Sequence, residues 1–333
     1  MGDFVKVLLI GSYPPPLGGV SVFIKRYRRR LEGEGHRVDV LDPARVSNVR
    51  LAMRLLAARR YDLISLNYPS LPVMTLLLAV GLASRTEVFE HNWRLLESWG
   101  AWARRVYALF LRRARALVLI APHLADYYRA HGLELPAHTR TSDAFIPPPE
   151  DEEAAIVASY PAEVREFLRT RRPLVVANAF KLVFREGVDL YGLDMCVELV
   201  ASLRSAHPSV GLLFALAEVG DEAYFAQTRE RIDALGLAPH VYFLTGQREL
   251  WPLLKSADLM LRPTSTDGAS VSVAEALHFG CPVVASDAAP RPPGTILFKS
   301  RDQQDFRRKC EAALASRRAD ALQRAGDKDA SSR

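Results

Sequence analysis

The sequence predicts an α/β protein of two units, each a doubly wound parallel β-sheet covered by helices. Short apolar runs of strand length alternate with segments of helical periodicity along almost the whole chain. This alternation is typical of βαβ units in parallel sheets. It breaks once, after residue 146, and resumes at residue 174. The chain has 333 residues, which is the length of about two domains.

The N-terminal half contains five apolar runs that we expect to be buried strands. Helices cover both faces of a parallel sheet, so its strands are apolar on both sides. These runs are residues 5–10, 38–41, 63–66, 87–90 and 117–120. The segments between them have the periodicity of helices. We expect helices at 20–34, 47–59, 72–83, 98–115 and 122–131.

Residues 147–173 interrupt the pattern, and we expect a linker there. The segment begins with three prolines, continues with an acidic run over 150–153 and ends in Arg171-Arg172-Pro173. Such stretches are typical of connections between structural elements. The predicted domains are therefore 1–146 and 174–300, followed by a terminal helix and polar tail over 301–333.

The alternation continues in the C-terminal half with similar spacing. We expect strands at 174–177, 211–215, 241–244, 258–261 and 282–285. The helices expected between them are 189–206, 221–235, 247–256 and 270–279. A last helix is expected over 302–317, and the polar residues 319–333 are expected to fray. Each half therefore predicts a unit with its own core.

Composition excludes several classes of protein. Hydrophobic residues make up 49% of the chain and charged residues 25%, so neither disorder nor a coiled coil describes it as a whole. The net charge is +6, but residues 1–150 carry +8 and the remainder carries −2. This imbalance indicates an anionic surface or ligand near the N-terminal half.

Cysteines and apolar runs predict where the protein resides. Three cysteines are too few for a disulfide framework and favour a reducing compartment. The apolar run before Pro14 is shorter than the core of a signal peptide. The longest apolar stretch, Leu71–Ala83, is shorter than the roughly 20 residues of a membrane helix. We expect a cytoplasmic protein, soluble or peripheral at the inner face of the membrane.

A glycine-rich loop follows the first expected strand. Ligands of open parallel sheets bind beyond the carboxyl ends of the strands. This loop runs from Gly11 to Val20 and includes Gly18 and Gly19. Glycine lets the backbone approach a phosphate or sugar, and the next helix offers free N–H groups. Because neither G-x-G-x-x-G nor Gly-Lys-Ser/Thr is present, a turn without a ligand is the alternative.

The helix expected after this loop carries the basic run Lys25-Arg26-Tyr27-Arg28-Arg29-Arg30. A solvated helix face is one interpretation. The other is contact with an anionic membrane surface or a lipid diphosphate, since each cation near such a surface adds about 1 kcal/mol. The run has little aromatic interleaving and matches no nucleic-acid motif, so we expect no nucleic-acid partner.

Two further loops carry groups suited to a ligand. His91 stands in Phe89-Glu90-His91-Asn92-Trp93, at the end of the fourth expected strand; a structural histidine is the alternative. Residues 178–187 follow the first strand of the second unit and include Asn178, Lys181 and Arg185. Cations here suit a diphosphate leaving group, and ordinary solvated charges are the alternative.

The strongest candidate site lies between the strand expected at 258–261 and the next helix. Asp267 precedes that helix, and Gly268 lets a ligand approach the backbone. Glu275 follows eight residues later amid apolar neighbours, and its carboxylate suits vicinal diols because each oxygen accepts one hydroxyl proton. The alternative is an N-cap followed by a surface helix. The first N–H groups of the helix are expected to bind an anion or sugar hydroxyls, and they belong to Ala269, Ser270, Val271 and Ser272.

These residues resemble the GT-B glycosyltransferases, specifically the retaining glycosyltransferase family 4, from residue 5 to about residue 310. The resemblance rests on Lys6–Gly11, Pro14–Gly19 and Gly35–Val38, and more specifically on the string from Ala257 through Asp267 and Glu275 to Asp287. It implies two facing Rossmann-like domains with a cleft between them. It also implies sugar transfer, with retention, from a UDP- or GDP-sugar to a glycan or lipid-linked acceptor in bacterial polysaccharide biosynthesis.

The resemblance implies a role for each matching residue. Glu275 matches the acid that binds the ribose, and Asp267 matches the acid that contacts the donor sugar, with Asp in place of the usual Glu. His91 matches a histidine that approaches the transferred sugar. Gly18 and Gly19 match the loop near the donor phosphates and the acceptor. Asn178 stands where the family usually has Arg, which leaves Lys181 and Arg185 as the available cations.

The resemblance further implies that no metal or other cofactor is required. No Asp-x-Asp motif stands between the expected strands. Lys181 or Arg185, together with the helix N-terminus, would stabilise the charge of the leaving diphosphate, and that phosphate would accept the proton of the acceptor. Two alternatives stay open, namely a non-catalytic module that binds nucleotide sugars and a GT-B epimerase.

Overall fold

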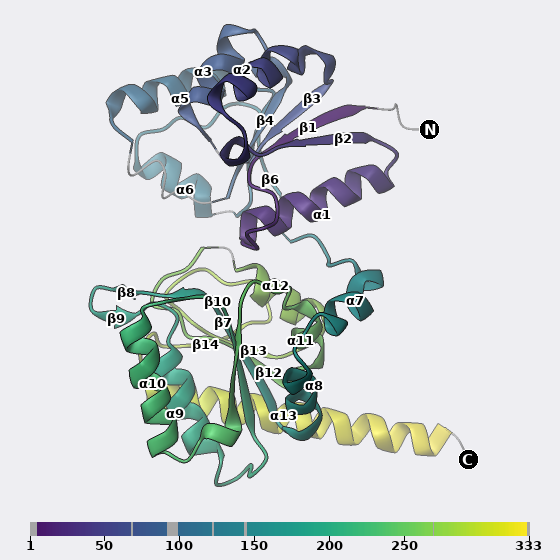
Figure 1. Ribbon diagram of the computed structural model, residues 1–333, viewed down its shortest axis with the longest axis vertical. Helices are drawn as coiled ribbons and strands as arrows, with labels where there is room; N and C mark the ends of the chain where they lie inside the picture. Colours follow the sequence, from purple (N-terminus) through teal and green to yellow (C-terminus); the bar gives the residue numbers. More distant parts are fainter. Residues whose placement is uncertain are drawn as a thin grey trace. The chain divides into compact units, whose positions relative to one another are not determined.

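The chain forms two compact units, residues 1–146 and 147–333, each built on a six-stranded sheet (Figure 1). The computed structural model describes residues 5–67, 69–91, 99–121, 123–142, 145–268 and 270–331. The strands pair in parallel throughout both six-stranded sheets. The predicted α/β class, with two doubly wound parallel sheets, is therefore confirmed.

The N-terminal sheet has the strand order β2-β1-β3-β4-β5-β6. Its strands are β1 (Lys6–Ile10), β2 (Arg37–Leu41), β3 (Leu63–Leu66), β4 (Thr86–Glu90), β5 (Ala116–Leu119) and β6 (Thr139–Thr141). The described α-helices of this unit are α1 (Gly19–Gly33), α2 (Asn48–Leu56), α3 (Leu71–Ala79), α5 (Ala101–Arg113) and α6 (His123–Ala130). The sequence did not predict β6, because Thr139-Arg140-Thr141 lacks an apolar run.

The C-terminal sheet has the order β11-β10-β7-β12-β13-β14. Its strands are β7 (Leu174–Leu182), β10 (Gly211–Gly220), β11 (Val241–Thr245), β12 (Leu259–Arg262), β13 (Val283–Ser286) and β14 (Ile296–Phe298). A small hairpin joins β8 (Phe184–Arg185) to β9 (Val188–Asp189). The helices are α9 (Leu193–Leu203), α10 (Glu222–Ala234), α11 (Trp251–Ser256), α12 (Val271–His278) and α13 (Gln303–Ser331).

The segment 147–173, expected to be a linker, contains two helices that belong to the C-terminal unit. These are α7 (Glu153–Ala158) and α8 (Ala162–Thr170). Tyr160, Val164 and Phe167 are buried in the core on one face of the C-terminal sheet. This burial stabilises the two helices. The prediction of a linker rested on the prolines and charged residues at the ends of the segment and overlooked the apolar positions between them. The expected polar tail is likewise helical, since α13 continues to Ser331.

Two layers of apolar side chains cover the C-terminal sheet. Val175 and Ala177 of β7 contact one cluster, to which α9 and α13 contribute. Leu174 and Val176 contact the other, to which α8, α11 and α12 contribute. Because side chains alternate along a strand, β7 is buried on both faces, as its continuous apolar run predicts.

Each sheet has one point at which the order of its strands reverses. In the N-terminal unit this switch point lies between β1 and β3, and in the C-terminal unit between β7 and β12. Ligands of open α/β sheets bind at such points, beyond the carboxyl ends of the strands. The residues that follow these four strands are therefore the candidates for each site.

Candidate functional site

Three side chains meet at the switch point of the C-terminal unit. Arg262, the last residue of β12, donates from Nη1 to the backbone oxygen of Asn178 at 3.0 Å. Ser272, in the first turn of α12, donates from Oγ to Oδ1 of Asn178 at 3.0 Å. The structure therefore brings together Asn178 and Ser272, both predicted site residues, and adds Arg262 as a second partner of Asn178.

The carboxylate of Asp267 is held by two buried arginines. Arg262 donates from Nε to Oδ2 at 2.8 Å and from Nη2 to Oδ1 at 3.0 Å, and Arg291 donates from Nη1 to Oδ2 at 2.6 Å. Only 12% of the Asp267 side chain and 1% of the Arg291 side chain are exposed. Burial raises the pKa of Asp267, but the two guanidinium groups outweigh this effect and lower that pKa to about 2. Asp267 is therefore ionised, and the three charges leave one net positive charge.

Arg291 also ties the loop after β12 to the end of β13. Its Nη2 donates to Oγ1 of Thr264 at 2.8 Å, and Oγ of Ser286 donates to the backbone oxygen of Thr264 at 2.6 Å. The sequence did not identify Arg291 as a site residue. The signal available was the pair of Arg-Pro steps, at 262–263 and 291–292, each just beyond an expected strand.

The donor loop, which we define as residues 263–268, packs on the turn that leads into α9. Ser265 donates its N–H to the oxygen of Leu190 at 2.9 Å. The guanidinium of Arg262 lies 5.2 Å from the ring centroid of Tyr191. Gly192 has φ 67°, and a Cβ there would lie 2.5 Å from the Pro263 oxygen. Only glycine fits at this position without displacing the loop.

The start of α12 contains the predicted anion-binding groups. Gly268 donates its N–H to Oδ1 of Asp267 at 3.0 Å, so this group is already used within the loop. A Cβ added to Gly268 would meet nothing within 4 Å, which leaves open space beside the backbone. Ser270 is the N-cap residue, and Val271 begins the helix. Ala269, also predicted to bind, lies outside the described residues.

Glu275 is a buried carboxylate on α12. It is 5% exposed, while its neighbours Val273 and Ala276 are fully buried. An N-cap followed by a surface helix would have left this carboxylate in solvent. Burial of an acidic side chain costs free energy unless polar groups or a ligand compensate it, so Glu275 is not an ordinary surface carboxylate.

Lys181 and Arg185 lie apart from these contacts. Residues 178–182 were expected in a loop, but they extend β7, and Lys181 pairs in register with Glu218 of β10. Arg185 stands on the β8–β9 hairpin, with 49% of its side chain exposed and its Nε 3.8 Å from Glu186. Among the described residues, the cations that contact Asp267 are Arg262 and Arg291 instead.

The N-terminal unit has a second cluster at its own switch point. Nε2 of His91 lies 3.2 Å from Oδ1 of Asn67, the residue that follows β3. Gly11, which follows β1, approaches both neighbouring elements so closely that a Cβ would lie 2.7 Å from Ile24 Cδ1 and 3.2 Å from Asn67 Cβ. The sequence predicted His91 but missed Asn67, whose only signal was its place after an apolar strand.

A buried hydrogen-bonded group fixes the strand that carries His91. Oε2 of Glu90 accepts hydrogen bonds from the hydroxyls of Tyr107, at 2.9 Å, and Tyr128, at 2.8 Å. These tyrosines come from α5 and α6, so the carboxyl end of β4 is anchored to both helices. Burial and the Glu90 carboxylate raise the pKa of each tyrosine well above its usual value.

The predicted glycines Gly18 and Gly19 lie at the start of α1. Gly18 is the N-cap residue, and its N–H donates to Oγ of Ser21 at 2.9 Å. Oγ of Ser21 in turn donates to the oxygen of Pro16 at 2.6 Å. A Cβ on Gly18 would meet nothing within 4 Å, so the space next to this loop is open, as a ligand-binding role requires.

We expect acid to destabilise the N-terminal unit through His91. Burial lowers the pKa of His91 from 6.5 to about 4, so below pH 6.5 the unfolded chain binds a proton that the folded chain does not. The contribution of this neutral histidine is complete above pH 6.5 and is lost as the pH falls towards 4. Between pH 7 and pH 5 the free energy of unfolding should fall by about 1–2 kcal/mol more than in His91→Gln.

Urea unfolding followed by circular dichroism at the two pH values measures this difference. His131→Gln serves as the control, because His131 is an exposed histidine of the same unit. An identical pH dependence in wild type and His91→Gln would show that burial of His91 does not control its protonation.

Comparisons with known proteins show which proteins this chain resembles. Residues 179–328 match the family model of glycosyl transferases group 1. A segment of 130 residues, 37% of this chain, is 28% identical to lipopolysaccharide glucosyltransferase WaaG of Escherichia coli K12, and it spans about a third (34%) of that protein.

Solved structures extend the similarity to both units. HepE from Anabaena, in complex with UDP and glucose, is 18% identical, with a TM-score of 0.63 over 96% of this chain and 95% of that chain. Sucrose-phosphate synthase from Thermosynechococcus elongatus is 16% identical, with a TM-score of 0.63 over 94% and 90%. These similarities establish the fold.

Neither a membrane-spanning helix nor a metal-binding cluster occurs among the described residues. None of the helices described is both long and apolar enough to cross a bilayer. No group of three or more His, Cys, Asp or Glu side chains placed to hold a metal ion was found among the described residues. The segment that matches the model of glycosyl transferases group 1 lies wholly within the C-terminal unit, and the chain has the fold of the GT-B glycosyltransferases.

Proposed function

We propose that this protein is a retaining glycosyltransferase that moves a sugar from a nucleoside diphosphate sugar to a hydroxyl of a saccharide or lipid-linked saccharide in bacterial glycan assembly. The observation that carries the proposal is the buried carboxylate of Glu275, on the helix that follows the donor loop at the switch point. The family match supports it, as do the similarity to the lipopolysaccharide glucosyltransferase WaaG and the UDP and glucose bound by HepE.

The nucleotide is proposed to bind at the C-terminal switch point. Glu275 accepts hydrogen bonds from the two ribose hydroxyls, because each carboxylate oxygen can take one. The N-terminal end of α12 faces the diphosphate and offers N–H groups that have no partner within the helix. Open space at Gly268 gives the ligand room. In this proposal the anion-binding N–H groups belong to Ala269, Ser270, Val271 and Ser272, and Gly268 contributes the open space beside its backbone.

The chemical step requires stabilisation of the leaving diphosphate. The bond between the anomeric carbon and the phosphate oxygen breaks, and the acceptor oxygen forms a new bond to that carbon on the same face. The developing negative charge of the phosphate is placed near the helix N-terminus and the net positive cluster of Arg262, Asp267 and Arg291. In the proposed role, Asp267 holds the loop in place and borders the sugar. Lys181 and Arg185 are exposed and are proposed to bind the outer phosphate oxygens, while the leaving phosphate takes the acceptor proton.

His91 is proposed to contact a sugar hydroxyl as a neutral imidazole. Its pKa of about 4 leaves it uncharged at neutral pH, so it serves as a hydrogen-bonding group and carries no charge. Asn67 sets which ring nitrogen is available, because it lies 3.2 Å from Nε2. Gly18 and Gly19 are proposed to lie near the phosphates and the acceptor.

A thermal-shift screen tests the proposal. The full chain is heated with UDP, GDP, UDP-glucose and GDP-mannose, and one nucleotide class should raise the melting temperature, because a ligand at 100-fold its Kd stabilises the folded state by about 2.7 kcal/mol. Release of the nucleoside diphosphate is then followed with glycan acceptors, and the product's anomeric configuration is read by NMR. Binding without release would favour a non-catalytic module, and conversion without an acceptor would favour an epimerase.

A further inference from the structure

The N-terminal unit exposes an apolar stripe along α2. Val49, Met53 and Leu56 are 68%, 56% and 54% exposed. Their spacing of four and three residues places them on one face of the helix. The opposite face is anchored by Leu55, which is fully buried in the core. Apolar side chains gathered on one exposed face are typical of a contact surface. Because α2 is held to the core by Leu55, this face stays exposed in the folded unit.

The segment that carries this stripe is strongly basic. No Asp or Glu occurs between Pro43 and Tyr61. Four exposed arginines surround the stripe, on α2 and on the 3₁₀ helix that continues it over Ala57–Arg60. These are Arg50, Arg54, Arg59 and Arg60. An apolar face flanked by arginines is complementary to a surface that is apolar inside and anionic outside.

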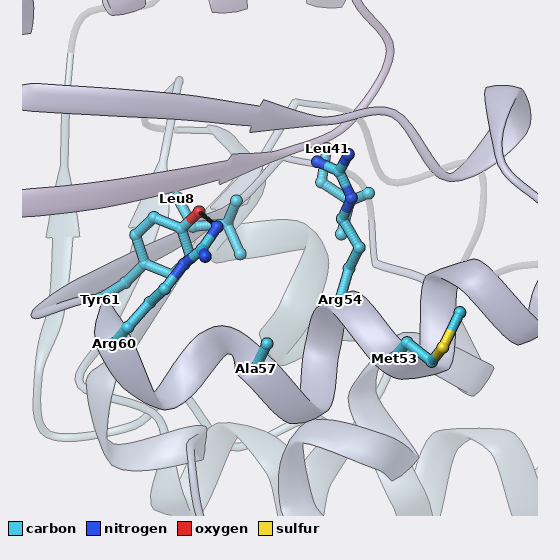
Figure 2. A pocket seen from close by; sticks show the side chains of 7 residues that line it. All are labelled: Leu8, Leu41, Met53, Arg54, Ala57, Arg60 and Tyr61. Atoms are coloured by element: carbon cyan, nitrogen blue, oxygen red, sulfur yellow. Dashed lines mark hydrogen bonds between the residues drawn. The ribbon is translucent and has the colours of Figure 1, made fainter.

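A cavity opens beside the stripe, between α2 and the sheet (Figure 2). Its volume is about 340 Å³, and Leu8 and Leu41 of the sheet are among its lining residues. Arg54 extends towards Leu41, and Arg60 lies against Tyr61, to whose hydroxyl it donates a hydrogen bond at 2.8 Å. Met53 lines the cavity and also belongs to the stripe.

The same cations continue into a neighbouring cavity of about 330 Å³. That cavity shares Arg60 with the first and adds Lys6 and Arg37. Asp39 also lines it and accepts a hydrogen bond from the Tyr61 hydroxyl at 2.6 Å. The two cavities therefore carry more positive than negative charge and suit an anion such as a phosphate group.

We propose that this α2 face, formed by the apolar stripe, its arginines and the cavity beside it, binds the surface of a membrane that contains anionic phospholipids. Val49, Met53 and Leu56 insert among the acyl chains, and Arg54 and Arg60 bind the lipid phosphates at the cavity. The combination of an apolar helix face and surrounding cations is what such an interface requires.

The contacts of α1 favour α2 over the basic run at 25–30 as the membrane surface. Arg26 is buried and donates to the oxygen of Ile146 at 3.2 Å. Arg28 and Arg30 form ion pairs with Glu32, at 2.8 Å, and with Glu34, at 3.4 Å. The large apolar residues of α1, such as Phe23 and Leu31, are buried, so α1 has no apolar stripe to insert.

A second helix of the same layer exposes apolar side chains. In Figure 1, α3 lies between α2 and α5, and it packs on both. On α5, Trp102 is 67% exposed and Leu109 is 44% exposed. Tryptophan is favoured at the boundary between water and lipid, so α5 extends the type of surface found on α2.

Sedimentation with vesicles tests the proposal. The full chain should bind vesicles of equal parts phosphatidylcholine and phosphatidylglycerol, should bind pure phosphatidylcholine more weakly, and should be released by salt. The variant Arg54→Gln/Arg60→Gln should bind more than tenfold more weakly, since each surface charge contributes about fivefold. Val49→Gln/Met53→Gln/Leu56→Gln should lose at least about tenfold, because its apolar area no longer leaves water.

The matched control is Arg29→Gln/Arg30→Gln on α1, which removes the same formal charge and should keep binding within about threefold. Equal loss in this control would overturn the α2 assignment, as would unchanged binding of the apolar variant or no vesicle binding by wild type. If light scattering instead finds that wild type is a dimer and that the apolar variant is a monomer, that result would assign the face to a second copy of the chain and also overturn the proposal. The assay uses no donor sugar, so it succeeds or fails independently of the proposed glycosyl transfer.

Discussion

Replacing Glu275 by glutamine is expected to lower donor affinity, and with it kcat/KM, by about 100-fold. Hydrogen bonds to an ionised group contribute roughly 1.5–3 kcal/mol, and a neutral amide offers one acceptor oxygen in place of two. Glu275 is 5% exposed on α12, and glutamine has nearly its shape, so the helix should stay folded. Calorimetric titration with the nucleotide identified by the thermal-shift screen measures the loss directly.

Glu222→Gln provides a matched control for this substitution. Glu222 is an exposed carboxylate in the first turn of α10, in the same unit, and its loss should leave the donor Kd unchanged. The assignment of Glu275 to the donor site fails if Glu275→Gln binds the nucleotide within about threefold of wild type while unfolding at the same temperature.

Replacing Asp267 by asparagine is expected to destabilise the C-terminal unit by about 3–5 kcal/mol. Removing one partner of a buried ion pair leaves uncompensated charge, and here two buried arginines, Arg262 and Arg291, would face each other. Because the pKa of Asp267 is lowered to about 2, its contribution is complete above pH 3.8 and is lost as the pH falls towards 2. Urea unfolding at pH 7 measures the difference.

Two variants locate the source of this effect. Asp267→Asn combined with Arg291→Met should regain part of the lost stability, because only one buried arginine stays uncompensated. Glu198→Gln breaks an ion pair to Arg231 of similar length, 2.9 Å, whose side chains are 44% and 57% exposed, and it should change stability by less than about 1 kcal/mol. If Asp267→Asn keeps wild-type stability but loses turnover, Asp267 acts on the sugar and does not clamp the loop.

The sequence predicts well what depends on local apolar pattern. The alternation of strands and helices anticipates most elements of both sheets, because parallel strands buried on both faces must be continuous apolar runs. It also points to the switch-point residue Asn178, because the apolar run of β7 ends at Ala177, where the pairing of β7 with β12 ends as well. Ser272 was predicted from its place at the start of the helix after β12. The two shortest edge strands, β6 and β14, were not predicted, because three residues are too few to show a recognisable apolar pattern.

Features that depend on distant partners could not be predicted. Arg291 is separated from Asp267 by 24 residues, and its Arg-Pro step does not show that the two side chains meet. The extension of β7 to Leu182 depends on an equal extension of β10, which supplies the hydrogen-bonding groups that residues 178–182 need. The helices in 147–173 depend on burial of Tyr160 and Phe167 against the C-terminal unit.

The contact between the donor loop and the turn before α9 joins two segments that are about 70 residues apart in the chain. Leu190 and Ser265 share a backbone hydrogen bond, and Gly192 has room for Pro263 only because it lacks a Cβ. Replacements at Gly192 and in the donor loop are therefore expected to be coupled in their effects on stability. A chimera that receives the donor loop of a relative is therefore expected to be more stable when residues 189–192 come from the same relative. The two segments are expected to change together, both in evolution and in engineered variants.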